Sequence, residues 1–237
     1  MSETTTQGAP VDLTGAGRPN LLDAWVLPEE GSALRLVEAD FVTAAADLDV
    51  EVAAVHAVAE VESGGRTGFD AQKRPKILFE IHHFREHTNQ RYDQTHPQLS
   101  APYSAKKTRR ASYARDQWVV IREAFALDKA AAVKSASWGM FQVLGSNAID
   151  CGWTTLQQFV TDMFLSEGQH MRAFLGFCRA NGLVGYLKRR QWASFAAAYN
   201  GPSYADNAYD TKMAAAYARW SGQTVGRPRR SKRRKRA

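Results

Sequence analysis

Cysteine is scarce in this sequence, with only Cys151 and Cys178 among 237 residues. Two cysteines cannot form the disulfide framework of a small secreted domain, and no CxxC pair is present to suggest a metal site. Each cysteine lies among apolar neighbours, in IDCGW and GFCRA. We therefore expect two buried free thiols, with a disulfide between them as the alternative.

A long apolar run is also missing. No stretch reaches the roughly 18 apolar residues that suggest a membrane-spanning helix. The first residues, MSETTTQGAP, lack the basic start and apolar core of a secretory signal peptide. We expect a chain that is made in the cytoplasm and needs outside help to reach any other compartment.

Acidic residues are absent from the last twelve positions, GRPRRSKRRKRA. The eight Lys and Arg residues there exceed the net charge of +7, so the rest of the chain carries about −1. This tail has no aromatic residue and no apolar face, which disfavours a single-stranded nucleic-acid site and an amphipathic membrane helix. We expect a disordered polycation drawn to phosphate-bearing surfaces, with a solubility tail as the alternative.

Three regions follow from the composition. Residues 1–35 are rich in Thr, Gly and Pro and predict an irregular arm, partly packed through Trp25. Residues 36–221 predict one mostly helical domain, and 222–237 form the basic tail. In the domain, apolar residues recur at helical spacing from about Glu38, and Asp49 is the expected N-cap of a second helix, VEVAAVHAVAEVES, which should stop at Gly64–Gly65.

The residue pattern changes after this helix. KILFEIHHF (76–84) is the one credible strand region, and the polar residues 88–113 predict a long surface loop. Helical spacing returns over 114–133, 155–180, 183–199 and 209–220, with Thr155 and Gln158 as a capping box. The expected fold is mostly α within an α+β class, with a small β element inserted after the second helix.

Glu60 and Glu62 close that helix in AEVESGG. Glutamates at helix ends are usually solvated, so the pair alone says little. Two further motifs follow in order, SASWGMFQVLG (135–145) and FAAAYNGPSY (195–204). The three together carry more weight than any one of them.

This order of motifs resembles goose-type lysozymes and lytic transglycosylases. With RPKILFEIHHF and YNGPSYADNAYDTKMAAAY, residues 38–219 are more similar to the N-acetylmuramidase family of phage endolysins. The resemblance implies a lysozyme-like fold, no cofactor or metal, and Glu62 as the catalytic acid. It also implies substrate contacts from the residues around the motifs, namely Ser63, Ser137, Gln142, Tyr199 and Asn200. Gly139 follows Glu62 by 77 positions, which is longer than in lytic transglycosylases and indicates an inserted lobe.

The chemistry of glycosidic cleavage suits Glu62. The reaction needs a carboxylic acid that is still protonated near neutral pH, whereas a free Glu has a pKa of about 4.3. Raising this to about 6 requires roughly 2.3 kcal/mol, which apolar neighbours and the negative end of a helix can provide. Glu60 lies about 200° away around the helix and should face elsewhere.

Other side chains remain open to two interpretations. Glu80 is the candidate second carboxylate, or else the partner of an Arg or Lys within the β lobe. Tyr199 can be a core aromatic and Gln142 a structural turn residue. On a strand, His82 and His83 would point to opposite faces, which disfavours a shared metal ion. The basic group at the end of the loop is a solvated face or a contact for anionic cell-wall polymer (Lys106, Lys107, Arg109 and Arg110).

The sequence therefore predicts a peptidoglycan hydrolase, acting as a monomer on peptidoglycan in the periplasm after membrane permeabilisation. Its basic tail would attract an anionic outer-membrane or phospholipid surface, and no nucleic-acid partner is expected. A lytic transglycosylase that leaves anhydro sugar ends is one alternative. A basic-tailed nucleic-acid-binding protein is another, but it leaves the three ordered motifs unexplained.

Overall fold

The computed structural model describes residues 24–201 and 207–222. Residues 1–23 of the predicted arm and 223–237 of the tail lie outside this part. The division into arm, domain and tail therefore stays a prediction. Within the described arm, Trp25 is buried and meets the ring of Phe125 edge-on at 5.0 Å.

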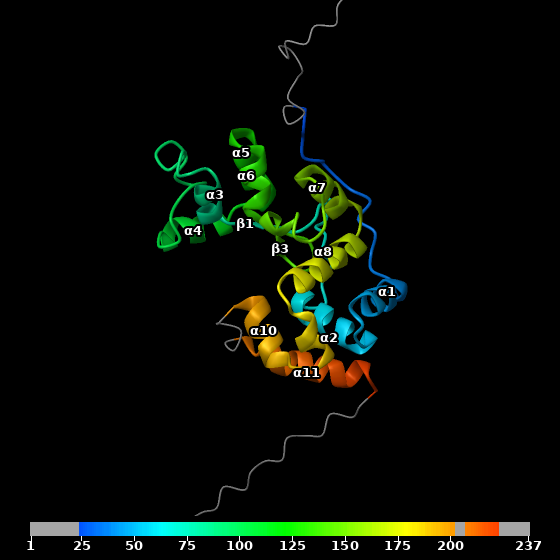
Figure 1. The fold of residues 1–237 in the computed structure, drawn as a ribbon. Helices are drawn as coiled ribbons and strands as arrows, with labels where there is room; N and C mark the ends of the chain where they lie inside the picture. Colours follow the sequence, from blue (N-terminus) through cyan, green and yellow to red (C-terminus); the bar gives the residue numbers. More distant parts are fainter. Residues whose placement is uncertain (1–23, 202–206, 223–237) are drawn as a thin grey trace, which may run out of the picture.

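Helices dominate the described chain (Figure 1). In chain order they are α1 (Glu38–Leu48), α2 (Val52–Ser63), α3 (Ile81–His87), α4 (Lys106–Tyr113), α5 (Gln117–Leu127), α6 (Lys129–Lys134), α7 (Leu156–Leu165), α8 (Glu167–Ala180), α9 (Val184–Lys188), α10 (Trp192–Asn200) and α11 (Tyr209–Trp220). A 3₁₀ turn, η1, covers Gly145–Asn147. The strands are β1 (Ile77–Phe79), β2 (Ala136–Trp138) and β3 (Val143–Leu144), antiparallel in the order β1-β2-β3. The mostly helical α+β prediction is confirmed. None of the described helices has the length and apolarity needed to cross a membrane.

Helix α2 ends where the sequence predicts. Residues 54–59 are buried, and the backbone turns into the left-handed region at Gly64, with φ 58°. Glycine adopts this conformation without the steric cost of a Cβ. The predicted N-cap was wrong: Glu51 precedes α2, whereas Asp49 is the left-handed C-cap of α1.

The predicted strand and loop also need correction. β1 stops at Phe79, and α3 begins at Ile81, because Ile81 and Phe84 are three apart and both fully buried, as on one helix face. The predicted loop contains α4. The other two strands, β2 and β3, belong to the second motif, which had not been assigned to a sheet.

Figure 1 shows α3–α6 at one end of the molecule and α1, α2, α10 and α11 at the other, with the sheet and α8 between them. Helix α11 packs along α2. Two tryptophans, Trp118 and Trp138, are buried where α5 meets the sheet, with ring centroids 6.0 Å apart. Cys151 and Cys178 are buried free thiols, as expected.

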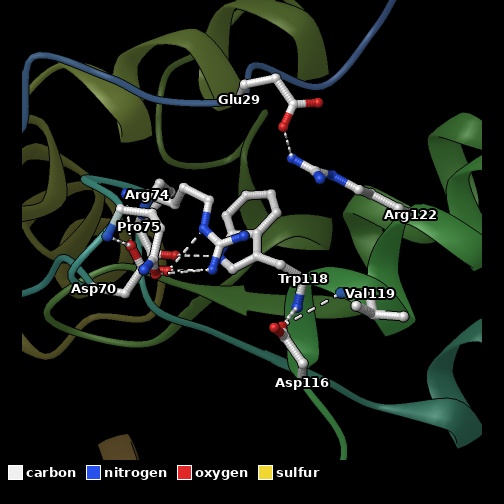
Figure 2. A network of polar contacts seen from close by, with 9 residues as sticks. Glu29, Asp70, Arg74, Pro75, Asp116, Trp118, Val119 and Arg122 are labelled. Atoms are coloured by element: carbon white, nitrogen blue, oxygen red, sulfur yellow. Dashed lines mark hydrogen bonds and ion pairs between the residues drawn. The ribbon is translucent and has the colours of Figure 1, made fainter.

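A polar network fixes the segment that leads into β1 (Figure 2). The Trp118 indole donates to the carbonyl of Pro75 at 3.1 Å, and the Arg74 guanidinium lies 5.4 Å from the Trp118 ring. Arg74 also pairs with Asp70 at 2.8 Å. Asp116 caps α5 by accepting a hydrogen bond from the backbone of Trp118 at 2.8 Å. These contacts hold the chain just before β1 against α5.

Candidate active site

Two cavities meet at the end of α2. One has a volume of about 390 Å³ and the other about 410 Å³, and Glu62 and Gln142 line both. Residues from the first and second sequence motifs are therefore brought together across the 77 positions that separate Glu62 from Gly139. Of the described residues that line these cavities, only Glu62 has a carboxylate.

Glu62 lies half-buried in the last turn of α2, one residue before the end of the helix. The negative end of the helix dipole lies near the carboxyl group, although the last carbonyls accept hydrogen bonds from the backbone of residues 64–66. Glu60 faces elsewhere, as predicted: it pairs with Arg219 and accepts a hydrogen bond from the Trp220 indole at 2.9 Å, both on α11. The two carboxylates thus have different surroundings.

Aromatic and aliphatic side chains form most of the wall of the smaller cavity. Besides Glu62 and Gln142, its lining consists of Phe141, Val143, Leu144, Asn147, Phe177, Tyr199 and Tyr209. Burial raises the pKa of Tyr199 well above its ordinary value, and the charge of Glu62 pushes it the same way. Burial and the Glu62 charge also raise the pKa of Tyr209. Both phenols therefore stay protonated beside Glu62.

Tyr199 is a core aromatic, one of the two interpretations from sequence, and it also lines the smaller cavity. Its ring packs in the core, stacked on Phe195 with centroids 5.5 Å apart. Its hydroxyl donates to the carbonyl of Phe141 at 2.9 Å. It thereby ties α10 to the turn between β2 and β3, which carries Gln142. The side chain of Asn200, the last residue of α10, lies outside the described part.

The side-chain amide of Gln142 stabilises that turn through both its nitrogen and its oxygen. Its Nε2 donates to the carbonyl of Gly139 at 2.8 Å and of Lys76 at 3.3 Å, and its Oε1 accepts from Ser137 at 2.9 Å. The backbone of Gln142 is left-handed, with φ 51°. The structural-turn interpretation of Gln142 is thus observed, in a residue that also lines both cavities.

A buried histidine on α8, His170, supports this turn. His170 accepts a hydrogen bond from the Met140 backbone at 3.1 Å and donates to the carbonyl of Met163 at 2.8 Å. Burial lowers the pKa of His170 to about 4, so the ring is neutral at pH 7. A Cβ at Gly139 would lie 2.6 Å from this ring, so only glycine fits there.

Glu167 holds the neighbouring segment. Its carboxylate is 1% exposed and accepts from the Thr67 hydroxyl and the Gly68 backbone, each at 2.8 Å, and from the Leu36 backbone at 3.0 Å. Arg35 pairs with it at 3.1 Å. Burial alone would raise the pKa of Glu167, but these bonds and the Arg35 charge lower it on balance. The carboxylate therefore joins the described arm, α8 and one cavity wall.

The second cavity has more charged side chains in its lining. Glu62, Gln142, Met140 and Gly139 share it with the residues Ser63, Arg66, Thr67, Lys76, Ile77 and Leu78. Ser63 donates to the carbonyl of Ala59 at 2.6 Å and accepts from the Gly65 backbone at 3.1 Å, so its hydroxyl also closes α2. Arg66 and Lys76 add two cations close to Glu62.

Glu80 follows β1 directly and precedes α3, and it is not among the described residues that line either cavity. Its carboxylate accepts a hydrogen bond from the Tyr113 hydroxyl and lies 3.5 Å from His82. The predicted alternative, an Arg or Lys partner, is replaced by this phenol and imidazole.

His82 and His83 sit on helix α3, so the argument from strand faces was wrong. In the described part of the chain, no three His, Cys, Asp or Glu side chains gather as metal ligands would.

Sequence reasoning missed several wall residues. Phe141 and Val143 lie within the second motif, and Tyr209 lies within YNGPSYADNAYDTKMAAAY. Their proximity in sequence to the motif residues could have identified them. Arg66, Lys76 and Phe177 carry no such signal, because only the tertiary fold brings them to Glu62.

Comparisons with known proteins agree with this geometry. A family model described as Muramidase, N-acetylmuramidase, matches residues 51–221. Among solved structures, the chain is similar to a Burkholderia AP3 phage endolysin, with 32% identity and a TM-score of 0.72 over 88% of this chain and 75% of that one. A comparison with curated protein sequences gives no match.

Proposed function

The chain belongs to the N-acetylmuramidase family, a peptidoglycan-cleaving glycoside hydrolase, and we propose that Glu62 donates the proton to its leaving glycosidic oxygen. The observation that carries this proposal is the position of Glu62 at the junction of two cavities in which it is the single described carboxylate. A bond held at that junction would have sugar units on both sides.

We infer that Glu62 holds its proton. Apolar and aromatic walls and the negative end of helix α2 disfavour a charged carboxylate and outweigh the opposite effect of Arg66 and Lys76. The neutral phenols of Tyr199 and Tyr209 add hydrogen-bonding capacity without adding charge. A general acid needs this combination, because it must hold its proton until the leaving oxygen develops charge.

We infer that the two cavities divide the substrate. Phe177 and Tyr209 offer aromatic faces to sugar rings on one side of Glu62. Arg66, Lys76 and the hydroxyls of Ser63 and Thr67 offer polar contacts on the other. Ser137 and Gln142 act through the turn that separates the two sides, since their side chains bond to each other. Asn200 stays a candidate for sugar contact.

Glu80 is proposed as the second carboxylate, acting on the attacking water. Its half-buried side chain follows β1, whose Leu78 lines the cavity beside Glu62. Inverting glycosidases place their two carboxyl groups about 6.5–9.5 Å apart, to leave room for a water molecule. Because Tyr113 and His82 hold Glu80, we expect it to orient water rather than to attack the sugar.

The reaction is tested by digesting purified peptidoglycan in ¹⁸O-labelled water. Hydrolysis gives reducing ends that carry one ¹⁸O atom, whereas a lytic transglycosylase gives unlabelled anhydro ends. The role of Glu62 is tested with Glu62→Gln, which should still sediment with peptidoglycan but no longer cleave it. Glu60→Gln is the matched control and should retain both properties. Loss of binding in Glu62→Gln would instead indicate a structural role.

We further propose that the enzyme acts in the periplasm as a monomer and that the tail, residues 226–237, draws it to anionic outer-membrane or phospholipid surfaces. The eight basic residues outside a nearly neutral body support this.

A further inference from the structure

Helix α4 presents a dense group of cations to an open cavity of about 710 Å³. The lining comes from α4 and the residue after it, and its polar members are Lys106, Lys107, Arg109, Arg110 and Tyr113. We call this the α4 basic cavity. Neither of the two cavities at Glu62 contains any of these residues.

These cations lack carboxylate partners in the described part of the chain. Several basic residues elsewhere do have such partners, as Arg85 pairs with Asp93 at 2.8 Å and Arg172 with Asp162 at 3.3 Å. In the α4 basic cavity, Arg109 instead lies 3.9 Å from the ring centroid of Tyr103 and donates to the Tyr103 carbonyl. The cavity therefore holds four positive charges that no described acid neutralises.

The arrangement is unfavourable for the helix itself. Lys106 and Lys107 occupy the first turn, where the helix dipole favours acids, and that turn contains none. Lys106 and Arg110 are also like charges at i,i+4, which repel each other. Lys106 and Lys107 are therefore unfavourable for the helix, and a bound anion would relieve both kinds of repulsion.

Helix α4 is connected to the cavities at Glu62 through strand β1. α4 packs against β1, and Leu78 in the middle of β1 lines the cavity that contains Glu62. Tyr113 bridges the same two elements, because it lines the α4 basic cavity and donates to Glu80, directly after β1. A glycan strand that extends from the cavities at Glu62 along β1 would therefore pass this cluster of cations.

We propose that the α4 basic cavity binds the carboxylates of the peptide stems on the glycan strand that is being cleaved. This rests on peptidoglycan being the substrate. The sugar backbone offers little charge, so the stem carboxylates are the anions that the substrate itself brings to α4. Lys and Arg bind carboxylates through charge-assisted hydrogen bonds, which suits four unpaired cations in an open cavity.

The test compares two substrates made from one peptidoglycan preparation: glycan strands with stems, and strands freed of stems by an amidase whose newly exposed lactyl carboxylates are then capped as methylamides. The double variant Lys107→Gln/Arg110→Gln removes two exposed charges and keeps good helix formers. On stem-bearing strands we expect its KM to rise about tenfold, since two exposed charge contacts contribute up to about that factor. On stripped strands its KM should equal that of the wild type.

The matched control, Lys73→Gln/Arg189→Gln, removes two exposed charges away from these cavities and should change neither KM. An equal loss on both substrates, or no loss, would overturn the proposal. Hydrogen-fluoride treatment removes phosphate-linked polymers; a loss that vanishes with them would mean that α4 binds phosphate polymer, which also contradicts the proposal.

A second readout separates this proposal from the reaction. In a Glu62→Gln background, sedimentation with stem-bearing strands should weaken when the α4 charges are removed, whether or not the wild type cleaves them. If the wild type cleaved neither substrate, the proposed function would fail while the α4 site could still be confirmed by this binding.

Discussion

Acid should unfold this protein through His170, and the structure sets the size of the effect. The ring is 1% exposed, its Nδ1 accepts from the Met140 backbone, and burial lowers its pKa from 6.5 to about 4. Between these pH values the unfolded chain binds a proton that the folded chain does not bind. Stability therefore increases with pH across this window and is lost as the pH falls.

The magnitude follows from the shift. At 1.36 kcal/mol per pH unit, lowering the pH from above 6.5 to 4 should cost about 3 kcal/mol of the free energy of unfolding. Glu167 acts in the same direction at lower pH, because its pKa is lowered in the fold and its hydrogen bonds are lost on protonation. Of these two acid-sensitive residues, His170 bonds directly to the turn that carries Gln142.

The assay is urea unfolding of the wild type and His170→Gln at pH steps from 7 to 4. Glutamine can keep one donor and one acceptor but does not titrate, so the slope of stability against pH between 6.5 and 4 should flatten by about 1 kcal/mol per unit. A wild-type slope retained in His170→Gln would refute the assignment of the titration to His170. Reduced stability at pH 7 with a flattened slope would not.

Three further outcomes are expected. Glu80→Gln should lower the rate of peptidoglycan cleavage, but by less than Glu62→Gln, and an unchanged rate would remove Glu80 from the mechanism. Gly139→Ala should destabilise the fold by clearly more than Gly65→Ala in urea unfolding: both glycines have φ 71°, which costs alanine about 1–2 kcal/mol, but only at Gly139 would the new Cβ meet His170. Deleting 226–237 should spare cleavage of isolated peptidoglycan and weaken action on intact outer-membrane-bearing cells, an effect that should fade at a few hundred millimolar salt. Equal loss on both substrates would place the tail within the catalytic domain.

Helical periodicity, capping residues and stop residues were sufficient to predict several of the helices. The valines at positions 52, 55 and 58 recur at helical spacing and Gly64 is a natural stop, so this helix and its end were predicted correctly. Thr155 likewise caps α7 by accepting from the Gln158 backbone at 3.1 Å. The N-cap was misplaced at Asp49, because an acidic residue before a helix can equally end the previous one.

The inserted lobe was harder to predict, for a physical reason. A three-residue strand that runs into a helix, as at Phe79 and Ile81, has no period of its own to detect. α4 is recognisable only by its contacts, because its exposed basic residues look like a loop. Strand β2 pairs with residues about 60 positions earlier, such as Ile77 with Trp138, and local reasoning does not see such pairs.

The motifs predicted the candidate site better than the lobe. Glu62, Gln142 and Tyr199 line one cavity, although they are far apart in sequence. The sequence did not reveal that His170 and Glu167 support the walls of the two cavities. It also did not reveal the cations that line one of them. These residues act through burial and long-range bonds that the spacing along the chain does not show.

The most direct measurement is the rate at which Glu62→Gln and Glu60→Gln release reducing ends from purified peptidoglycan, side by side with the wild type. General acid catalysis contributes about 10²–10⁴ in rate. We predict that Glu62→Gln loses at least about a hundredfold with its unfolding curve unchanged, while Glu60→Gln stays within a few-fold of the wild type. A Glu62→Gln enzyme that retains more than about a tenth of the wild-type rate would contradict the central claim.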